Sequence, residues 1–488
     1  MTSRLALLAF SVLPLIGMTG RTRAAESARP NVLFICVDDL KPVLGCYGDK
    51  LARSPNIDRL AKRGIVFEMA YCNQALCSPS RNSLMTGLRP TSMGIYDLTT
   101  NFREAMPDAV TVAQYFQRHG YRTEAVGKIM HPSNGNHEDA ASWSVPLFWA
   151  DSGTYLSRKN RSSTRANQAS KPLVFEEDDV PDSFYFDGRV ADEAIKRLGN
   201  AKSKPDEPQF LAVGFLKPHL PFRVPKKYWD LHDRSKFKLA ENPSAPLGAP
   251  AFAGTNSEEL RSYREIPATA LPDELQRKLI HGYYAAVSYM DAQVGRLLDE
   301  LDRLGLAEKT VIVLWGDHGW HLGDHSLWGK KTNYEAAARI PLIVAGPGIA
   351  RSATSSALVE TVDLYPTLAE LAGLPAPIVT QKLEGRSFAT TARDPRVPTK
   401  DAVFHAYPRN RKPDGQVIGR AVRTERYRLV EWKKPGAAPG TATLELYDYA
   451  TDPLETKNLA DEKPRIVEEL RRVLATQPEA LPQFHAPR

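Results

Sequence analysis

The stretch from Asn31 to Asp39 reads NVLFICVDD. Its first seven residues, Asn31–Val37, form an almost unbroken apolar run, and the carboxylates of Asp38 and Asp39 follow at once. A continuous apolar run of this length is typical of a strand that is buried on both faces of a parallel sheet. Four more such runs occur: residues 121–126 before Gly127, Lys128 and His131; residues 210–215 before Lys217, Pro218 and His219; residues 311–315 before Gly316, Asp317 and His318; and residues 341–345 before Gly346-Pro347-Gly348.

Helical patterns lie between these strands. Residues 285–301 place apolar side chains on one helical stripe, and residues 359–371 show the same spacing. Strands that alternate with helices indicate an α/β fold, with a parallel sheet covered by helices. Ligands bind beyond the carboxyl ends of the strands in such folds, so the polar clusters after the strands predict one shared active site.

The N-terminal segment differs from the rest of the chain. Residues 1–25 combine a basic start, an apolar run at residues 5–18 and the small pair Ala24-Ala25. This pattern is typical of a cleaved secretory signal peptide, with a buried N-terminal helix as the alternative. It predicts a secreted or periplasmic protein.

The remaining chain divides into two predicted parts. Residues 26–410 carry the strand–helix pattern and form the predicted catalytic domain. Within them, the polar stretches 140–182 and 231–265 lack periodicity and predict long surface loops beside the cleft. Residues 411–488 form a predicted subdomain with a small antiparallel sheet, from strand-like runs at 417–422, 427–432 and 443–449 and a helical pattern at 464–475.

The overall charge is mildly positive. The chain has 64 Lys and Arg against 57 Asp and Glu, and three of the arginines lie in the predicted signal segment. The mature chain therefore has a net charge of +4, which suits an anionic substrate. Without a long basic run the sequence predicts no nucleic-acid partner, and without a later long apolar stretch it predicts no stable membrane insertion.

The cysteines cluster near the N-terminus. A secreted protein held together by disulfides would spread its cysteines more widely. If Cys77 has a chemical role, at most one disulfide can form within the chain, and its pairing stays open. The four cysteines are Cys36, Cys46, Cys72 and Cys77.

The sharpest local motif is CSPSRNSLMTG at residues 77–87. It resembles the sulfatase signature, in which the cysteine is converted to formylglycine, and Cys77, Arg81 and Thr86 match key positions of that signature. A thiol is poorly suited to attack a sulfate sulfur. A hydrated aldehyde has one hydroxyl to attack and a second that can later expel the sulfate. The alternative interpretation is a buried cysteine beside a turn proline.

Paired carboxylates mark a candidate metal site. Asp38 and Asp39 follow one strand and Asp317 follows another, so three carboxylates can meet at one edge of the sheet. Such oxygen-rich sites suit calcium or magnesium, and we predict calcium rather than zinc. His318 is the unusual member, because hard cations prefer oxygen ligands.

Cleavage of a sulfate ester also needs cations around the oxyanions and an acid for the leaving alkoxide. The candidates that follow strands are Lys128, His131, Lys217, His219 and Lys330. Histidines 321 and 325 lie near the metal pair and fit ordinary loop positions equally well. The other histidines have no context that favours a functional role: His119, His137, His232, His281, His405 and His485.

Longer stretches extend the resemblance over nearly the whole mature chain. They include VDDLKPVLGCYGD at 37–49, SPNIDRLA at 54–61, YFQRHGYRTEAVGKIMHP at 115–132, LAVGFLKPHLPFRVP at 211–225 and GDHGWHLGDHSLWGKKTN at 316–333. On these residues the chain resembles the type I, formylglycine-dependent sulfatases of the alkaline phosphatase superfamily. The resemblance implies a large mixed, mainly parallel sheet between helices and a small antiparallel C-terminal sheet.

The resemblance also implies a role for each matching residue. Asp38, Asp39, Asp317 and His318 would hold one calcium ion together with residue 77. Arg81 and Lys128 would steady the formylglycine hydrate, and His131 would act as the base that breaks down the sulfated intermediate. His219 and Lys330 would contact the sulfate and help to protonate the leaving oxygen. A formylglycine-generating or sulfatase-maturating enzyme is the implied partner that modifies Cys77.

The substrate is implied less directly. His318 replaces an asparagine that many sulfatases have, and Lys128 and His131 are three residues apart rather than two. In both features the chain resembles the branch that acts on 2-O-sulfated uronic acids. The mild positive net charge of the chain suits other sulfated polysaccharides equally well. A phosphoester or phosphonate hydrolase of the same superfamily and a non-catalytic binder of sulfated glycans remain as alternatives. The sequence leaves the oligomeric state and the choice between exo and endo action open.

Overall fold

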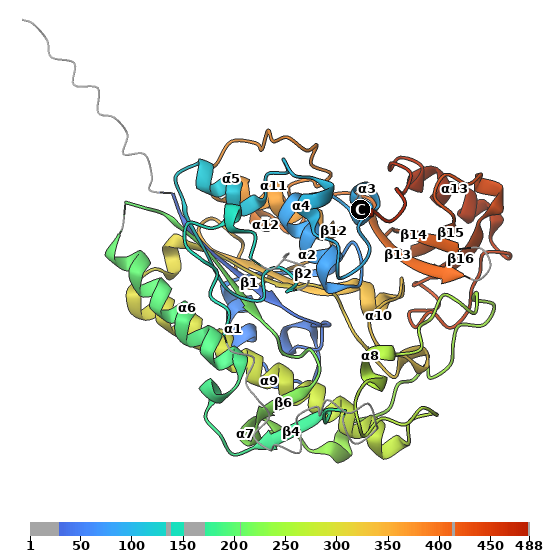
Figure 1. Ribbon diagram of the computed structural model, residues 1–488, viewed down its shortest axis with the longest axis horizontal. Coiled ribbons are helices and arrows are strands. Elements are labelled where there is room, and N and C mark those ends of the chain that lie inside the picture. Colours follow the sequence, from blue (N-terminus) through green and yellow to red (C-terminus); the bar gives the residue numbers. More distant parts are fainter. Residues whose placement is uncertain (1–28, 133–137, 151–170, 205, 412–414, 487–488) are drawn as a thin grey trace, which may run out of the picture.

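The computed structural model describes residues 29–132, 138–150, 171–204, 206–411 and 415–486 (Figure 1). At its centre, β1 (Asn31–Val37) lies between two parallel neighbours, β5 (Gln209–Phe215) and β7 (Thr310–Gly316). Six of the seven β1 residues are buried, as expected for a strand covered on both faces. The predicted signal segment, residues 1–25, lies outside the described residues.

The main sheet is mixed but mostly parallel, as predicted. Its order is β11-β2-β10-β7-β1-β5-β3, with β12 also paired to β2. Only β10 runs against its neighbours β7 and β2. The strands not yet given bounds are β2 (Gly64–Tyr71), β3 (Arg122–Gly127), β10 (Arg339–Ala345), β11 (Ala353–Ser355) and β12 (Val359–Glu360).

The direction of β10 corrects one expectation. Residues 341–345 form a strand as predicted, but the turn at Gly346 does not lie at the active-site edge. A Cβ on Gly346 would meet the carbonyl oxygen of Thr310, at the amino end of β7. The chain leaves β7 at the active-site edge and folds back from that edge as β10, so β10 is antiparallel.

Helices cover both faces of the sheet (Figure 1). One face packs β1 side chains such as Leu33 and Ile35 against one group of helices, and the other face packs Val32 and Phe34 against a second group. The first group is α1 (Pro55–Arg63), α6 (Phe186–Ser203) and α9 (Asp273–Leu304); the second is α2 (Cys77–Thr86), α5 (Val112–Arg118), α11 (Leu364–Leu371) and α12 (Ala389–Arg393).

One of the two predicted helices is confirmed, and the other starts later than predicted. The stripe at 285–301 is the buried part of the longer helix α9. The expected helix at 359–371 starts only at Leu364, because Val359–Glu360 is the short strand β12 beside β2. Buried Glu360 pairs with Arg89 at 2.8 Å and Lys400 at 2.7 Å, so long-range ion pairs favour the extended segment over the helical periodicity.

The C-terminal sheet has four antiparallel strands, of which the sequence predicted three. The missed strand, β13 (Val403–Arg411), starts before residue 411 and includes Pro408. Proline is depleted in strands, which hid β13 in the sequence. The rest of the subdomain is β14 (Gly415–Arg423), β15 (Tyr427–Lys433), β16 (Thr443–Asp448) and α13 (Pro464–Leu474).

The polar stretches at 140–182 and 231–265 are mainly irregular where they are described. The first contains the short strand β4 (Phe175–Asp178) and the second the single-turn helix α8 (Glu258–Arg261). All four cysteines lie in the described part of the chain and are free thiols. Within that same part, no helix has the length and apolar character needed to cross a membrane.

Candidate active site

Every predicted site residue lies at or just beyond the carboxyl edge of the main sheet. The loops after the parallel strands supply most of them, and helix α2 and the segment after a short antiparallel strand supply the rest. Asp38 and Asp39 follow β1, Lys128 and His131 follow β3, His219 follows β5, Asp317 and His318 follow β7, Lys330 follows β9 (Trp328–Gly329), and Cys77 and Arg81 lie in α2.

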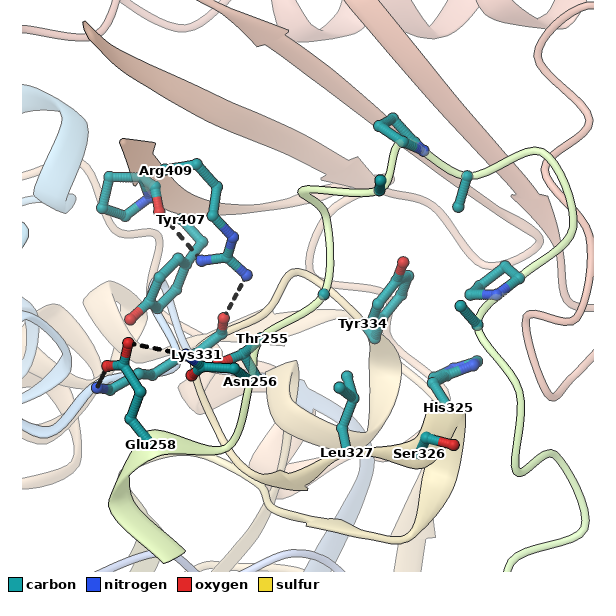
Figure 2. A pocket seen from close by; sticks show the side chains of 17 residues that line it. Thr255, Asn256, Glu258, His325, Ser326, Leu327, Lys331, Tyr334, Tyr407 and Arg409 are labelled. Atoms are coloured by element: carbon teal, nitrogen blue, oxygen red, sulfur yellow. Dashed lines mark hydrogen bonds and ion pairs between the residues drawn. The ribbon is translucent and has the colours of Figure 1, made fainter. Parts of the chain in front are cut away.

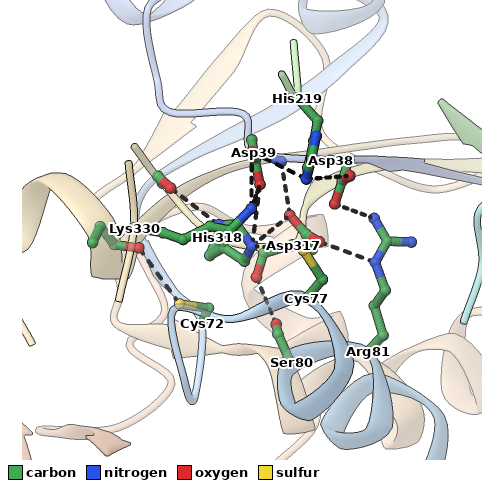
Figure 3. Close-up of polar contacts among 12 residues, drawn as sticks. Asp38, Asp39, Cys72, Cys77, Ser80, Arg81, His219, Asp317, His318 and Lys330 are labelled. Atoms are coloured by element: carbon green, nitrogen blue, oxygen red, sulfur yellow. Dashed lines mark hydrogen bonds and ion pairs between the residues drawn. The ribbon is translucent and has the colours of Figure 1, made fainter. Parts of the chain in front are cut away.

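Acidic side chains and Cys77 meet in one buried cluster (Figure 3). Ligand atoms of Asp38, Cys77, Asp317 and His318 all lie within 4.8 Å of one another. His318 Nε2 is 3.3 Å from Cys77 Sγ, 3.3 Å from Asp39 Oδ1 and 3.6 Å from Asp317 Oδ1. These five side chains are at most 2% exposed.

The orientation of His318 is set by its other nitrogen. Nδ1 lies 3.0 Å from the carbonyl oxygen of Gly319, so Nδ1 carries the proton and donates it. In a neutral ring, Nε2 then directs a lone pair toward the carboxylates of Asp39 and Asp317. His318 Nε2 and these carboxylate oxygens therefore lie close enough together to share a bound cation.

The pKa values of two carboxyl groups in this cluster are shifted in opposite directions. Burial alone would raise the pKa of Asp38, but Lys128, His219 and Arg81 outweigh it and hold that pKa well below its usual range. Burial raises the pKa of Asp317, and the nearby charge of Asp38 adds to the effect. Burial therefore outweighs the charges of His318 and Arg81 at Asp317, whereas the neighbouring cations outweigh burial at Asp38.

Cys77 is the first residue of helix α2, where the helix dipole favours negative charge. The loop from β2 brings it to the sheet edge, so β2, which the sequence patterns did not reveal, carries the candidate nucleophile. Burial raises the pKa of the Cys77 thiol well above its usual value, and the charge of Asp38 acts in the same direction. The thiol is therefore protonated at neutral pH and a weak nucleophile.

Arg81 lies one turn after Cys77 and is fully buried. Its Nε donates to Asp317 Oδ2 at 3.0 Å, and its Nη2 lies 3.3 Å from Asp38 Oδ1. Its Nη1 also donates to the carbonyl oxygen of Lys128. Arg81 thereby joins the carboxylates from two strands to the loop after β3.

Two lysines flank the cluster on different sides. Lys128 Nζ lies 2.5 Å from Asp38 Oδ2. Lys330 Nζ lies 2.7 Å from Asp39 Oδ1 and 3.2 Å from Glu259 Oε2. Both ammonium groups are buried and face the space around Cys77, where they can balance the charge of a bound sulfate.

His219 faces the same space. Its Nδ1 lies 2.6 Å from the carbonyl oxygen of Leu220 and donates to it. Its Nε2 is 3.0 Å from Glu259 Oε1 and 3.9 Å from Asp39 Oδ2. Burial lowers the pKa of His219, but the charges of Asp39, Glu259 and Asp38 outweigh burial and raise it above its usual value.

Glu259 is the site residue that sequence reasoning missed. It lies in α8, inside the polar stretch 231–265 that was predicted only to flank the cleft. His219 and Lys330, which both contact it, hold the pKa of its carboxyl well below the usual range despite burial. No motif marks Glu259, so only its contacts identify it.

Lys217, which the sequence singled out with His219, has a different position. Its Nζ donates to the carbonyl oxygens of His219 at 2.6 Å and Pro221 at 2.8 Å. Burial lowers its pKa to about 7. Asp187 accepts backbone N–H bonds from Leu216 and Lys217, both at 2.8 Å. Lys217 and Asp187 therefore position the loop that carries His219.

His131 is the neutral base candidate. Burial, followed by the charge of Lys128, lowers its pKa to about 3. Its Nδ1 is buried and has no hydrogen-bond partner among the described residues. A neutral imidazole with a free nitrogen can accept a proton.

The remaining histidines of the described residues lie outside the cluster. His321 Nε2 lies 2.9 Å from Thr332 Oγ1, and His325 packs on the ring of Tyr334. His232 and His281 belong to an aromatic group around Phe237. Position 137 lies outside the described residues.

Comparison with protein families agrees with this geometry. The model described as "Sulfatase" matches residues 30–374, and the model of the N-sulphoglucosamine sulphohydrolase C-terminal region matches residues 323–480. Together they extend over the main sheet and the C-terminal sheet.

Curated relatives give the same result. The iduronate 2-sulfatase of Homo sapiens is 36% identical, with 88% of this chain and 90% of that protein covered. The choline-sulfatase of Rhizobium meliloti is 29% identical, with 90% and 84% covered.

Solved structures share the fold. A phosphonate monoester hydrolase of Agrobacterium radiobacter has a TM-score of 0.70 at 21% identity, over 92% of this chain and 95% of that one. A structure described as a 2-O GAG sulfatase has a TM-score of 0.69 at 24% identity, over 92% and 91%. Since a sulfatase model matches most of the chain and an iduronate 2-sulfatase is more than one-third identical over 88% of it, the chain belongs to the sulfatase family.

Proposed function

We propose that this sulfatase removes sulfate from a sulfated carbohydrate, a 2-O-sulfated uronic acid, with formylglycine at position 77 and one calcium ion. The observation that carries the proposal is the buried cluster in which Cys77 meets three carboxylates and His318, with Arg81 and the lysines around it. The identity to iduronate 2-sulfatases supports the uronic acid. Export through residues 1–25 and modification of Cys77 by a maturating enzyme belong to the same proposal.

The surroundings of position 77 suit a modified side chain. Cys77 is 2% exposed and protonated, so the unmodified thiol cannot act as a strong nucleophile. Formylglycine, as its hydrate, would supply a hydroxyl that attacks sulfur and a second that later expels sulfate. Arg81 and Lys128 are the cations that would hold the hydrate in position.

The donor set fits a hard cation. Asp38, Asp39, Asp317 and His318 would hold calcium together with residue 77. The ion would neutralise sulfate oxygens and polarise the nucleophile.

Different side chains would donate and accept protons during the reaction. His219 and Lys330 contact the same Glu259 carboxylate and face one space, so both can bind the sulfate there. His219 would protonate the leaving sugar oxygen. His131, which is neutral, would take up a proton when the enzyme regenerates the free hydrate.

Calcium should restore the metal-free enzyme better than zinc does, because oxygen ligands outnumber nitrogen ligands. Asp317→Asn removes one anionic ligand and should weaken calcium binding by about tenfold or more, measured by calorimetry. Asp394→Asn, on a surface carboxylate paired with Arg396, is the matched control and should bind calcium normally. Stoichiometric zinc in the protein as isolated, found by elemental analysis, would contradict the prediction.

A phosphoester or phosphonate hydrolase is the second candidate, because a phosphonate monoester hydrolase shares the fold over most of both chains. Initial rates should be compared on a 2-O-sulfated uronic acid disaccharide, an aryl sulfate and an aryl phosphate. We expect kcat/KM on the sulfated disaccharide to exceed that on the aryl phosphate by about a hundredfold or more, a transition-state difference of about 2.7 kcal/mol. A preference for the phosphate would reverse the assignment.

A further inference from the structure

The backbone of Asp39 has an unusual conformation. Among the proposed calcium ligands, only Asp39 lies in the left-handed region, with a φ of 62°. Aspartate adopts this region more readily than most residues, but it is still unfavourable for any residue with a Cβ and persists only where surrounding contacts hold it. Asp39 is fully buried, so the contacts that hold it come from the protein.

A tyrosine of helix α9 supplies the main contact. Tyr283 Oη donates to the carbonyl oxygen of Asp39 at 2.6 Å and accepts from the backbone N–H of Lys41 at 2.9 Å. One phenol oxygen thus bridges a carbonyl group and the N–H two residues later. A side chain from α9, more than 240 positions away in the sequence, therefore closes the turn that follows β1.

The conformation of Asp39 affects two proposed ligands together. Its backbone N–H donates to Asp317 Oδ1 at 2.9 Å, and its own Oδ1 lies 3.3 Å from His318 Nε2. A rotation of the Asp39 backbone would redirect both the N–H and the carboxylate. The group that holds this backbone therefore orients the carboxylates of both Asp39 and Asp317.

Tyr283 is itself held rigidly. Its ring is fully buried and packs edge-on against Phe222, with the ring centroids 6.1 Å apart. A cavity of about 740 Å³ lies beside the active site (Figure 2), and none of the described residues that line it belongs to α9. Tyr283 therefore acts on Asp39 from the core of the protein and not from the side on which this cavity opens.

We propose that Tyr283 is a positioning residue for the calcium site: its hydroxyl holds the backbone of Asp39 in the left-handed conformation and thereby sets the affinity of the site for the ion. The proposal rests on the proposed function, of which calcium is a part. Removal of a group that hydrogen-bonds to a metal ligand typically weakens metal affinity about tenfold to a hundredfold.

Tyr283→Phe tests the proposal, because it removes the hydroxyl and keeps the ring. Calcium is titrated by calorimetry into protein that a chelator has freed of metal. We expect Kd for calcium to rise about tenfold or more, because the carbonyl of Asp39 and the N–H of Lys41 lose their shared partner. The free calcium concentration that gives half-maximal sulfatase activity should rise by the same factor, and saturating calcium should recover most of the wild-type kcat.

Tyr289→Phe is the matched control. Tyr289 lies on the same helix and is equally buried, and its hydroxyl makes the same pair of bonds: it donates to the carbonyl oxygen of Asp182 and accepts from the N–H of Gly188, both at 2.8 Å. Neither partner is a proposed ligand. Tyr289→Phe should therefore lose a comparable amount of stability and bind calcium like the wild type.

Melting temperatures with and without calcium are measured for both variants, to separate a loss of stability from a loss of calcium affinity. If Tyr283→Phe is too unstable for calorimetry, its Kd follows from the rise in melting temperature over a range of calcium concentrations. This second measurement keeps the test decisive for a weakly folded variant.

An unchanged Kd for calcium in Tyr283→Phe, or an equal rise in Tyr289→Phe, would overturn the proposal, and turnover of sulfate esters by the wild type would leave the proposed function standing. The reverse result is also distinct. If the wild type turns over no sulfate ester but binds calcium about tenfold more tightly than Tyr283→Phe does, the proposed reaction fails and the positioning role of Tyr283 survives.

Discussion

Cys77→Ala should lose turnover of sulfate esters by about four orders of magnitude or more, because it removes the nucleophile on which the reaction depends. The fold should remain intact. Cys77 is the first residue of α2, its side chain is small, and alanine is a good helix former. Sulfate release from purified protein, measured with the circular dichroism spectrum and the melting temperature, checks both expectations.

The modification of Cys77 can be read directly by mass spectrometry. Trypsin cleaves after Arg63 and Arg81, so one peptide, residues 64–81, contains both Cys72 and Cys77. Formylglycine makes this peptide about 18 Da lighter by its chemical formula. After alkylation the modified peptide should carry one label, on Cys72, instead of two.

The control for Cys77→Ala is Cys46→Ala. Cys46 lies away from the cluster, with its backbone N–H bonded to Asp58 Oδ1 at 2.7 Å, so its loss should leave activity unchanged. Substantial sulfatase activity in Cys77→Ala would refute the nucleophile assignment. A peptide that stays wholly at the cysteine mass would favour a non-catalytic binder of sulfated glycans.

His219→Ala should lose about a hundredfold to a thousandfold in kcat on a sugar sulfate and at most about tenfold on an aryl sulfate. The sugar alkoxide is a poor leaving group that needs a proton in the transition state, whereas an activated phenolate leaves without much help. The structure presents His219 in the form of a donor. Its Nδ1 already donates to Leu220 O, and a contact of 3.0 Å from Nε2 to Glu259 favours a second proton.

The contact between His219 and Glu259 also affects how kcat depends on pH. The pKa of His219 is raised, so the donor form persists to higher pH than in a free histidine and is lost as pH rises through that pKa. Glu259 is not one of the proposed calcium ligands, so it continues to support the imidazolium when a cation occupies Asp38 and Asp39. The alkaline decline in kcat on the sugar sulfate should therefore disappear in His219→Ala.

His219→Gln separates proton transfer from sulfate binding. A glutamine side chain can hydrogen-bond to sulfate but cannot transfer a proton to the leaving oxygen. It should be as slow as His219→Ala on the sugar sulfate. Recovery of activity in His219→Gln, or equal losses on both substrates in His219→Ala, would show that His219 binds sulfate or supports the loop. His131 would then become the candidate donor.

The local pattern of the sequence was sufficient for five strands of the main sheet and for most of the site. A continuous apolar run such as Asn31–Val37 has apolar side chains on both faces of the strand. The run therefore predicts a central strand that helices cover on both sides. Parallel strands end at a common edge, so Asp38 and Asp317, 279 positions apart in sequence, could be predicted to meet. The signature at residues 77–87 singled out Cys77 and Arg81 for the same site.

Other features depended on contacts between distant segments. Glu259 carries no motif, and its role follows from its approach to His219 and Lys330. The segment at Glu360 has helical periodicity, yet ion pairs with Arg89 and Lys400 keep it extended.

The sequence by itself determined five buried strands of the main sheet, the residues that follow them and the cysteine that is the candidate nucleophile, because these features depend on local patterns and motifs. Only the tertiary structure decided the antiparallel course of β10 and the contacts of Glu259 with His219 and Lys330. Sheet pairing, ion pairing and the neutralisation of buried charge depend on partners that lie far away in the sequence, and the fold alone selects those partners.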